Sequence, residues 1–257
     1  MAANGSHVRL RSILGLPEGA IMPPITYQTS LQRKMLRCED TGVFRFDRPF
    51  GYSAAPGQWF RLTLDTQDGP QTKTFSDAAA PDELEIDLVT RLSGSAFKRA
   101  LLALRIGDRV TISGPGGRLR APDDSERIAL LMGGVGIAPG RAILRDRVRR
   151  ADGSAKLCLF EGSNDDSCVV FGSEFDDYAA RLGWFELVSV IADPSAQWTG
   201  EAGLISADVI SRHIEVGDGW HFLVAGPPAM TDAMRGVLAQ LGVSDDRATF
   251  ETFSGYA

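Results

Sequence analysis

The chain has 257 residues, 44% hydrophobic and 23% charged, a composition typical of a globular protein with one large or two ordinary domains. Its net charge of −6 gives no general support for nucleic-acid binding, and no apolar run is long enough to span a membrane, so we expect neither partner. Cys38, Cys158 and Cys168 are widely spaced and form no CxxC motif, so we expect free thiols, no metal site and a cytoplasmic location. The start, MAANGSHV, lacks the apolar core of a signal peptide, and we treat residues 1–24 as an N-terminal extension that is partly an expression remnant.

The region 25–121 is rich in strand-like segments. Six of them alternate or run apolar, with Gly, Pro or Asp between them, which predicts an antiparallel β-barrel or sandwich. One exception is a helix that places Phe97, Leu101 and Leu104 on one face, with Ser95 as its N-cap. The six predicted strands are 25–37, 42–46, 58–64, 72–76, 83–90 and 108–114.

The pattern changes near residue 122, after which strands and helices alternate. Most of the strands are continuous apolar runs, as expected for a parallel sheet that is covered on both faces. The region 122–257 therefore predicts a doubly wound α/β domain with a five-stranded parallel sheet. The predicted strands are 128–132, 156–160, 184–190, 221–226 and 248–253, and the predicted helices are 139–150, 172–182, 206–214 and 228–242.

Two glycine-containing loops leave strands of this second domain. The first reads MGGVGIAPG at 132–140 and the second reads VAGPPAM at 224–230. Each loop would bring backbone N–H groups and the positive end of a helix dipole to the carboxyl edge of the sheet, where ligands bind in such folds. The spacing differs from the Rossmann GxGxxG. The two loops favour a dinucleotide site, and the alternative is two ordinary strand–helix turns.

Eight short motifs occur in the order found in one family. Together they make the chain resemble the ferredoxin–NADP reductase superfamily of FAD-dependent oxidoreductases, over about residues 25–257. It looks closest to the stand-alone bacterial reductases that carry no iron–sulfur module. The motifs are PGQW at 56, KTFS at 73, GSAFKRAL at 94, GDRVTISGPGG at 107, GGVGIAP at 133, WTG at 198, AGPPAM at 225 and ETFSGY at 251.

The resemblance implies an FAD site in the first domain. Phe75 would lie against the isoalloxazine ring and Ser76 near flavin N5, although spacing alone favours Phe75 as a core aromatic. Lys73 stands where the family has an arginine on the flavin phosphate, and it lacks the bidentate fork of that arginine. Ser76 and Glu251 are the candidate catalytic residues, with a surface acid as the alternative for Glu251. The implied flavin-binding residues are Lys73, Thr74, Phe75, Ser76, Val89, Thr90, Gly94, Ser95, Ala96 and Phe97.

The resemblance also implies a nicotinamide dinucleotide site in the second domain. Asp165 stands at one place where NADPH-selective relatives carry an arginine, and Ala192 and Asp193 stand at a second. This predicts NADH as the preferred cofactor and leaves NADPH as the alternative. Asp165 and Asp166 could instead only cap or solvate a loop, while Arg181 or Arg212 reaches a phosphate from elsewhere. The implied residues are Gly133, Gly134, Gly136, Ile137, Ala138, Pro139, Ser163, Asn164, Asp165, Gly226, Pro227, Met230 and Tyr256.

The function implied by the resemblance is hydride transfer from NAD(P)H to FAD, with electrons then passing to a protein carrier. A ferredoxin, a flavodoxin or an oxygenase component would be that carrier, and we expect a monomer. Five arginines between 141 and 150 could attract an acidic carrier, although a solvated helix face is the simpler interpretation. The alternatives are a reductase of free flavin or ferric chelates and a non-catalytic subunit that keeps the fold.

Overall fold

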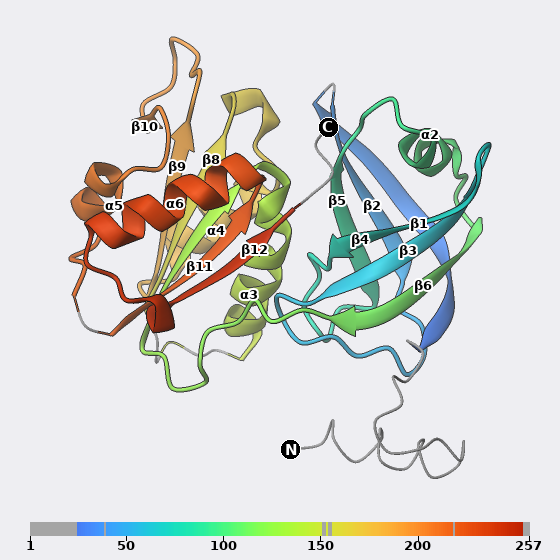
Figure 1. Cartoon of the computed structure of the whole chain (residues 1–257), viewed down its shortest axis with the longest axis horizontal. Helices are drawn as coiled ribbons and strands as arrows, with labels where there is room; N and C mark the ends of the chain where they lie inside the picture. The colour runs from blue at the N-terminus through green and yellow to red at the C-terminus, as the bar shows by residue number, and fades with distance from the viewer. Residues whose placement is uncertain (1–24, 39, 151–152, 154–155, 218, 254–257) are drawn as a thin grey trace.

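A computed structural model describes residues 25–38, 40–150, 153, 156–217 and 219–253, and it contains two sheets that lie side by side (Figure 1). The N-terminal extension 1–24 and Tyr256 lie outside the described residues. The first sheet uses strands up to Gly116 and the second begins at Arg127, with the polar linker 121–126 between them. The expected order of an antiparallel domain followed by an α/β domain is therefore confirmed.

The first sheet has six antiparallel strands in the order β4-β3-β6-β1-β2-β5. It is barrel-like without being closed, because the two edge strands meet only through an isolated bridge between Asp77 and Leu88. The inward-facing positions of its strands form one core with Phe44, Phe60 and Leu88 among its members. The strands are β1 (Thr26–Cys38), β2 (Thr41–Asp47), β3 (Trp59–Thr66), β4 (Gly69–Ser76), β5 (Glu85–Arg91) and β6 (Arg109–Gly116).

A short helix, α2 (Ala96–Ala103), connects β5 to β6. Its N-cap is Ser95, whose hydroxyl accepts a hydrogen bond from the backbone N–H of Lys98, as the sequence predicted. Phe97 and Leu101 point into the core of the first sheet. This packing fixes the start of the helix beside β4, because the Phe97 ring stacks on the Phe75 ring at a centroid distance of 5.8 Å.

The second sheet has six strands in the order β10-β9-β8-β7-β11-β12, one more than predicted. The additional strand, β10 (Glu201–Ala202), is only two residues long and pairs with the end of β9. The order reverses at β7, next to which the first glycine loop lies. The other strands, all parallel, are β7 (Arg127–Gly133), β8 (Lys156–Ser163), β9 (Phe185–Ile191), β11 (Trp220–Gly226) and β12 (Ala248–Thr252).

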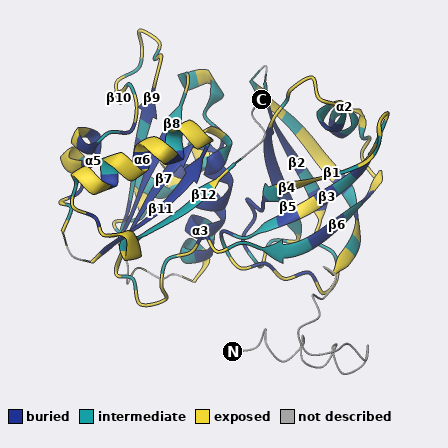
Figure 2. Ribbon diagram, viewed as in Figure 1, coloured by how far each residue is buried: buried dark blue, intermediate teal, exposed yellow. Residues whose placement is uncertain are grey.

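Helices cover both faces of the second sheet, and the strands between them are the most buried part of the domain (Figure 2). On α6, Met234 and Leu238 face the core, and Gly242 follows the helix with a φ of +72°, at the end of the predicted helix 228–242. Among the described residues, none of the helices has the length and apolarity needed to cross a membrane. The helices are α3 (Ile137–Arg149), α4 (Gly172–Arg181), α5 (Ala207–His213) and α6 (Pro228–Gln240).

The two domains are joined by ion pairs from α3, which corrects the expected role of its arginines. Arg141 is only 3% exposed and reaches Asp87 at 3.3 Å in the first domain and Glu174 at 2.9 Å in its own domain. Its guanidinium also donates to the carbonyl of Ala78 at 2.7 Å. The neighbouring Arg145 contacts Glu174 and Glu83. The side chains of Arg141 and Arg145 therefore hold the two domains together, and they are not available to bind an acidic protein.

A second link between the domains corrects the expectation of free thiols. Cys38, the last residue of β1, forms a disulfide with Cys168 in the short 3₁₀ helix η2 (Asp166–Cys168) of the second domain. Cys158 is free and buried in β8. A pairing across 130 residues could not be deduced from the spacing of three cysteines.

Candidate functional site

Two neighbouring clefts open at the junction of the domains. The large cleft has a volume of about 820 Å³ and the small cleft about 440 Å³. Asp40, Arg91 and Val135 line both of them, so the clefts share a wall that is built by both domains. Asp40 and Arg91 form an ion pair of 2.9 Å within this wall. Two ligands bound in these clefts would lie next to each other.

The large cleft is built mainly on the carboxyl edge of the parallel sheet. Both glycine loops contribute to it, through Gly133 and Gly134 from the first and Pro227 and Met230 from the second. A cleft of this size is in the range that holds small molecules and cofactors. This edge of a doubly wound sheet is where ligands bind in such folds.

The glycines of the first loop are required for different reasons. A Cβ on Gly136 would meet the carbonyl oxygen of Ala225 at 2.2 Å, and one on Gly133 would meet Met230 Sδ at 2.0 Å. These two glycines therefore allow close packing of the loop against β11 and α6. Gly134 has a φ of +53° and open space around its Cβ position, so it exposes backbone to the cleft. Part of the glycine pattern thus serves packing, and Gly134 faces the ligand space.

The loop after β8 forms another side of the large cleft with Ser163, Asn164 and Asp165. The carboxylate of Asp165 accepts a hydrogen bond of 3.0 Å from the backbone N–H of Ser167 and so caps η2. The next residue, Asp166, accepts hydrogen bonds from the Ser195 hydroxyl and backbone N–H. Asp165 therefore both lines the cleft and caps the loop.

The small cleft brings together the two candidate catalytic residues. The Ser76 hydroxyl at the end of β4 donates a hydrogen bond of 2.8 Å to Glu251 Oε1 on β12, although the residues are 175 positions apart. Both line the small cleft. Burial raises the pKa of Glu251, while the hydrogen bond from Ser76 acts in the opposite direction. The pair crosses the domain boundary, so it forms only when both domains are in place.

An aromatic ring and a lysine also line the small cleft. The Phe75 ring lines it, and Lys98 Nζ lies 4.7 Å from the centre of that ring. Lys98 also donates a hydrogen bond to the Thr90 hydroxyl. Burial lowers the pKa of Lys98 to about 8, with a smaller contribution from the charge of Lys73. The small cleft thus presents an aromatic face, hydroxyl groups and the Lys98 amine, whose pKa is lowered.

The structure places the predicted site residues in three groups. Most line one of the clefts, and a second group lines neither. In the second group, Phe97 and Ile137 are core residues and Ser95 is a helix cap. The predicted residues that line a cleft are Thr74, Phe75, Ser76, Val89, Thr90, Gly133, Gly134, Ala138, Ser163, Asn164, Asp165, Pro227, Met230 and Glu251. Those that line neither are Lys73, Gly94, Ser95, Ala96, Phe97, Gly136, Ile137, Pro139 and Gly226, and Tyr256 lies outside the described residues.

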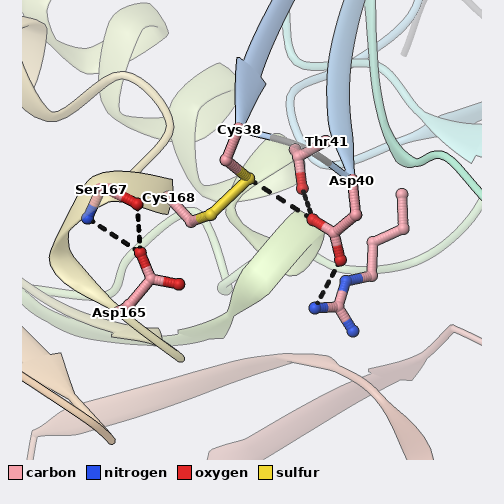
Figure 3. Close-up of a disulfide and its surroundings, with 7 residues drawn as sticks. Cys38, Asp40, Thr41, Asp165, Ser167 and Cys168 are labelled. Carbon is pink, nitrogen blue, oxygen red and sulfur yellow. Dashed lines mark hydrogen bonds and ion pairs between the residues drawn. A yellow bond between two sulfur atoms is a disulfide. The ribbon is translucent and has the colours of Figure 1, made fainter.

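Sequence reasoning missed the contribution of the β1–β2 hairpin to the large cleft. Cys38 and Asp40 line it from the first domain, opposite Cys168 from the second (Figure 3). Lys98 also lines the small cleft, although it was not among the predicted site residues. A weak sequence signal for this contribution was that Cys38 and Cys168 both lie outside the predicted strands.

A barrel-like antiparallel sheet, a doubly wound parallel sheet and two adjoining clefts at their junction define a two-domain fold with room for two neighbouring ligands. Residues 130–236 match the family described as Oxidoreductase NAD-binding domain. The resemblance to the ferredoxin–NADP reductase superfamily that the motifs predicted is confirmed at the level of the fold.

Solved structures with this fold include a cytochrome P450 reductase from Amycolatopsis, with a TM-score of 0.79 and 22% identity over 93% of this chain and 73% of that one. A ferredoxin NADP⁺ reductase from Neisseria gonorrhoeae with bound FAD and NADP has a TM-score of 0.78 and 17% identity, over 88% of this chain and 98% of that one. Identities this low establish the shared fold alone.

Sequence relatives are components of a larger enzyme, the Na(+)-translocating NADH-quinone reductase. The F component of this enzyme in Shewanella denitrificans is 32% identical over 158 residues, which are 60% of this chain and 39% of that component. The same component in Yersinia pseudotuberculosis is 26% identical over 230 residues, 82% of this chain and 56% of the relative. The chain therefore spans between about two fifths and just over half of these relatives.

The chemistry of the small cleft fits the FAD that the fold family implies. Phe75 offers an aromatic face, and the hydroxyls of Ser76 and Thr90 offer hydrogen-bonding groups for the edge of a flavin ring. Lys98 and the nearby Lys73 supply positive charge suited to a phosphate or to the electron-rich part of the ring. All of these groups come from the first domain, while Val135 and Ala138 of the first glycine loop also line the small cleft.

Proposed function

We propose that this chain is an FAD-dependent NADH reductase that passes electrons to a protein acceptor. The observation that carries the proposal is the wall of Asp40, Arg91 and Val135 that the two clefts share. A nicotinamide dinucleotide in the large cleft and a flavin in the small cleft would meet at this wall, as direct hydride transfer requires. The matched Oxidoreductase NAD-binding domain supports the large cleft as the nucleotide side.

The protein's part in this reaction is positioning. When bound, FAD would supply the hydride-accepting chemistry. Ser76 holds a hydroxyl at the small cleft, oriented by its hydrogen bond to Glu251. Glu251 in turn is half-buried and comes from the second domain, so its hydrogen bond with Ser76 forms only when the two domains are packed together. Phe75 forms an apolar face that excludes water from the same space.

NADH is the proposed electron donor. Asp165 lines the large cleft, where its negative charge disfavours the 2′-phosphate of NADPH. Ala192 lines the cleft after β9, so this position also offers no cation to a phosphate. Arg181 and Arg212 are already paired, with Asp177 and Glu201 respectively. The name of the relatives, NADH-quinone reductase, agrees with NADH as donor.

The acceptor in this proposal is a one-electron carrier protein such as a ferredoxin, a flavodoxin or an oxygenase component. The relatives are components of a quinone reductase, so a quinone reached through further proteins is the competing acceptor. The arginines of α3 that pair with acids contribute little positive charge to a docking face. The monomeric state, the cytoplasmic location and the lack of membrane contact that the sequence led us to expect stay predictions.

The proposal is tested by loading the purified protein with FAD, removing free flavin by gel filtration and following NADH oxidation with ferricyanide as a one-electron acceptor. We expect the protein to keep its yellow colour and to turn over NADH at least tenfold more efficiently than NADPH. A tenfold preference corresponds to repulsion of about 1.4 kcal/mol between Asp165 and the 2′-phosphate. Protein that stays colourless after FAD addition would contradict the proposal.

One observation favours a competing function, a non-catalytic subunit that keeps the fold. Lys98 Nζ lies over the Phe75 ring, where it covers part of the aromatic face that a flavin would use. A free-flavin or ferric-chelate reductase is the other alternative. Protein that binds no FAD would favour the non-catalytic role. Protein that turns over only with added free flavin, and keeps none after gel filtration, would favour the flavin reductase.

A further inference from the structure

We propose that Cys38 and Cys168 form a reversible disulfide that holds the nucleotide-recognition loop against the first domain and thereby sets the affinity for the dinucleotide. The inference rests on the proposed function, because it assumes that the large cleft binds NADH. Its core observation is independent of that assumption: a single covalent bond joins the two domains on the wall of the large cleft (Figure 3).

The disulfide attaches the recognition loop, residues 163–168, at its far end. This loop begins with Ser163 and Asp165 on the cleft wall and ends at Cys168 on η2. Its beginning is fixed by β8 and its middle by the cap from Asp165 to Ser167. With the disulfide closed, both ends of the loop are fixed. With the disulfide open, Cys168 loses its side-chain bond to the first domain, and the loop keeps the hydrogen bonds of Asp166 with Ser195.

The closed disulfide is compatible with a nucleotide in the cleft. The volume of about 820 Å³ is measured with the bond present, and the two sulfur-bearing residues line the cleft without filling it. The oxidised protein is therefore the state in which the loop is organised before binding. Reduction adds an ordering cost to binding, since a freed loop must be fixed again when the ligand arrives.

The positions of Cys38 and Cys168 allow the disulfide between them to be reduced and re-formed. Both are half-buried and border a cleft that reaches solvent, and their Cα atoms lie 5.4 Å apart, within the range that disulfides adopt. Cys158, in contrast, is fully buried, and burial raises the pKa of its thiol well above the ordinary value. Its thiolate is therefore too scarce to compete in exchange. The chemistry is confined to the pair that links the domains.

The open state also has partners for its groups. Cys38 Sγ lies 3.4 Å from Asp40 Oδ1, so a reduced Cys38 thiol can donate to that carboxylate. Asp40 keeps its ion pair with Arg91 and its hydrogen bond from the Thr41 hydroxyl at 2.9 Å. Because Asp40 and Arg91 also belong to the shared wall, the redox state of Cys38 changes the hydrogen bonding of Asp40 at the place where the two clefts meet.

The exchange reaction is balanced with a small-molecule disulfide as the oxidant. One protein thiolate attacks that disulfide, forms a mixed disulfide and releases one small thiol. The second protein thiolate then attacks the sulfur of its partner cysteine, forms the Cys38–Cys168 bond and releases the second small thiol. Two protein thiols are oxidised, one small disulfide is reduced to two thiols, and a dithiol reverses the reaction.

The test compares NADH binding to oxidised and dithiothreitol-reduced protein by calorimetry, without added FAD so that hydride transfer contributes no heat, and with the bond state checked by thiol counting. We expect the Kd for NADH to rise about 3- to 10-fold on reduction, the effect of losing order in one or two side chains. Amide exchange of residues 163–168 in the absence of nucleotide should become faster on reduction. The double variant Cys38→Ser with Cys168→Ser should match the reduced wild type and ignore the reductant, and Cys158→Ala should respond as the wild type does.

Each other outcome identifies what has failed. Equal Kd values and equal amide exchange in the two redox states would overturn the redox inference and leave the proposed function intact. NADH binding to neither state would contradict the proposed function, and unchanged amide exchange would then overturn the redox inference separately. Because Cys38, Asp40 and Cys168 could also surround a cation, the isolated protein should be assayed for zinc. Stoichiometric zinc that is lost in the double cysteine variant would overturn the redox assignment.

Discussion

Replacing Arg141 with alanine should weaken the junction between the domains more than any exposed arginine of α3 can. Arg141 is 3% exposed, and its partner Asp87 is 1% exposed. Removing one member of a buried ion pair costs about 3–5 kcal/mol, because the other charge is left without its partner. Asp87 keeps two hydrogen bonds of 2.7 Å from Arg45, so we expect the lower end, about 3 kcal/mol.

The assay is thermal unfolding followed by calorimetry. For a chain of this size, about 3 kcal/mol corresponds to a Tm that is lower by about 6–12 °C. The matched control is Arg149→Ala, because Arg149 also reaches the first domain, at Asp82, but both side chains of that pair are nearly half exposed. An exposed pair contributes at most about 1 kcal/mol, so the Tm should fall by no more than about 4 °C. Equal Tm shifts in the two variants would refute the idea that the buried ion pair between Arg141 and Asp87 holds the domains together.

Three further predictions concern the site and the pH dependence of stability. Ser76→Ala should lower the rate of NADH-dependent turnover at least about tenfold while FAD is retained, since it removes the hydroxyl at the small cleft; unchanged stopped-flow rates would count against a role for Ser76. Asp165→Asn should raise the efficiency with NADPH relative to NADH by about tenfold in steady-state kinetics, since it keeps a capping oxygen and removes the charge; a constant ratio would show that Asp165 does not face the phosphate. Burial raises the pKa of Glu161 to about 8, with a smaller contribution from the charge of Asp176. The folded state therefore holds a proton that the unfolded state releases near pH 4.5, and this contribution to stability is lost as pH rises from there through about 8. In urea unfolding, Glu161→Gln should consequently lose less stability than the wild type over that pH range, and parallel curves for the two proteins would contradict the assignment.

Much of the fold could be predicted because its signals are local. The stripe of Met234 and Leu238 on α6 follows from helical spacing, and the hydroxyl cap of Ser95 follows from residue type and position. The sixth strand of the second sheet could not, because Glu201 and Ala202 are too short a run to show a period of two. They pair there because the chain returns along the end of β9.

The site was predictable where it follows strand ends and unpredictable where it depends on the other domain. Ser76 and Glu251 were proposed separately, and only the folded chain shows that one donates to the other. The arginines of α3 suggested an exposed basic face, since nothing local indicates that Asp87 lies behind Arg141. Cys38 and Cys168 likewise meet only through the tertiary arrangement. Contacts between domains carry no periodic signal, so these three features required the structure.

The measurement that tests the central claim most directly is an anaerobic titration of the FAD-loaded protein with NADH, followed by flavin absorbance. We predict that the flavin band is bleached by about one equivalent of NADH per flavin, because the two clefts share a wall and NADH is a hydride donor. FAD that stays bound and oxidised in the presence of excess NADH would contradict this claim, since the two clefts would then not place donor and acceptor in contact.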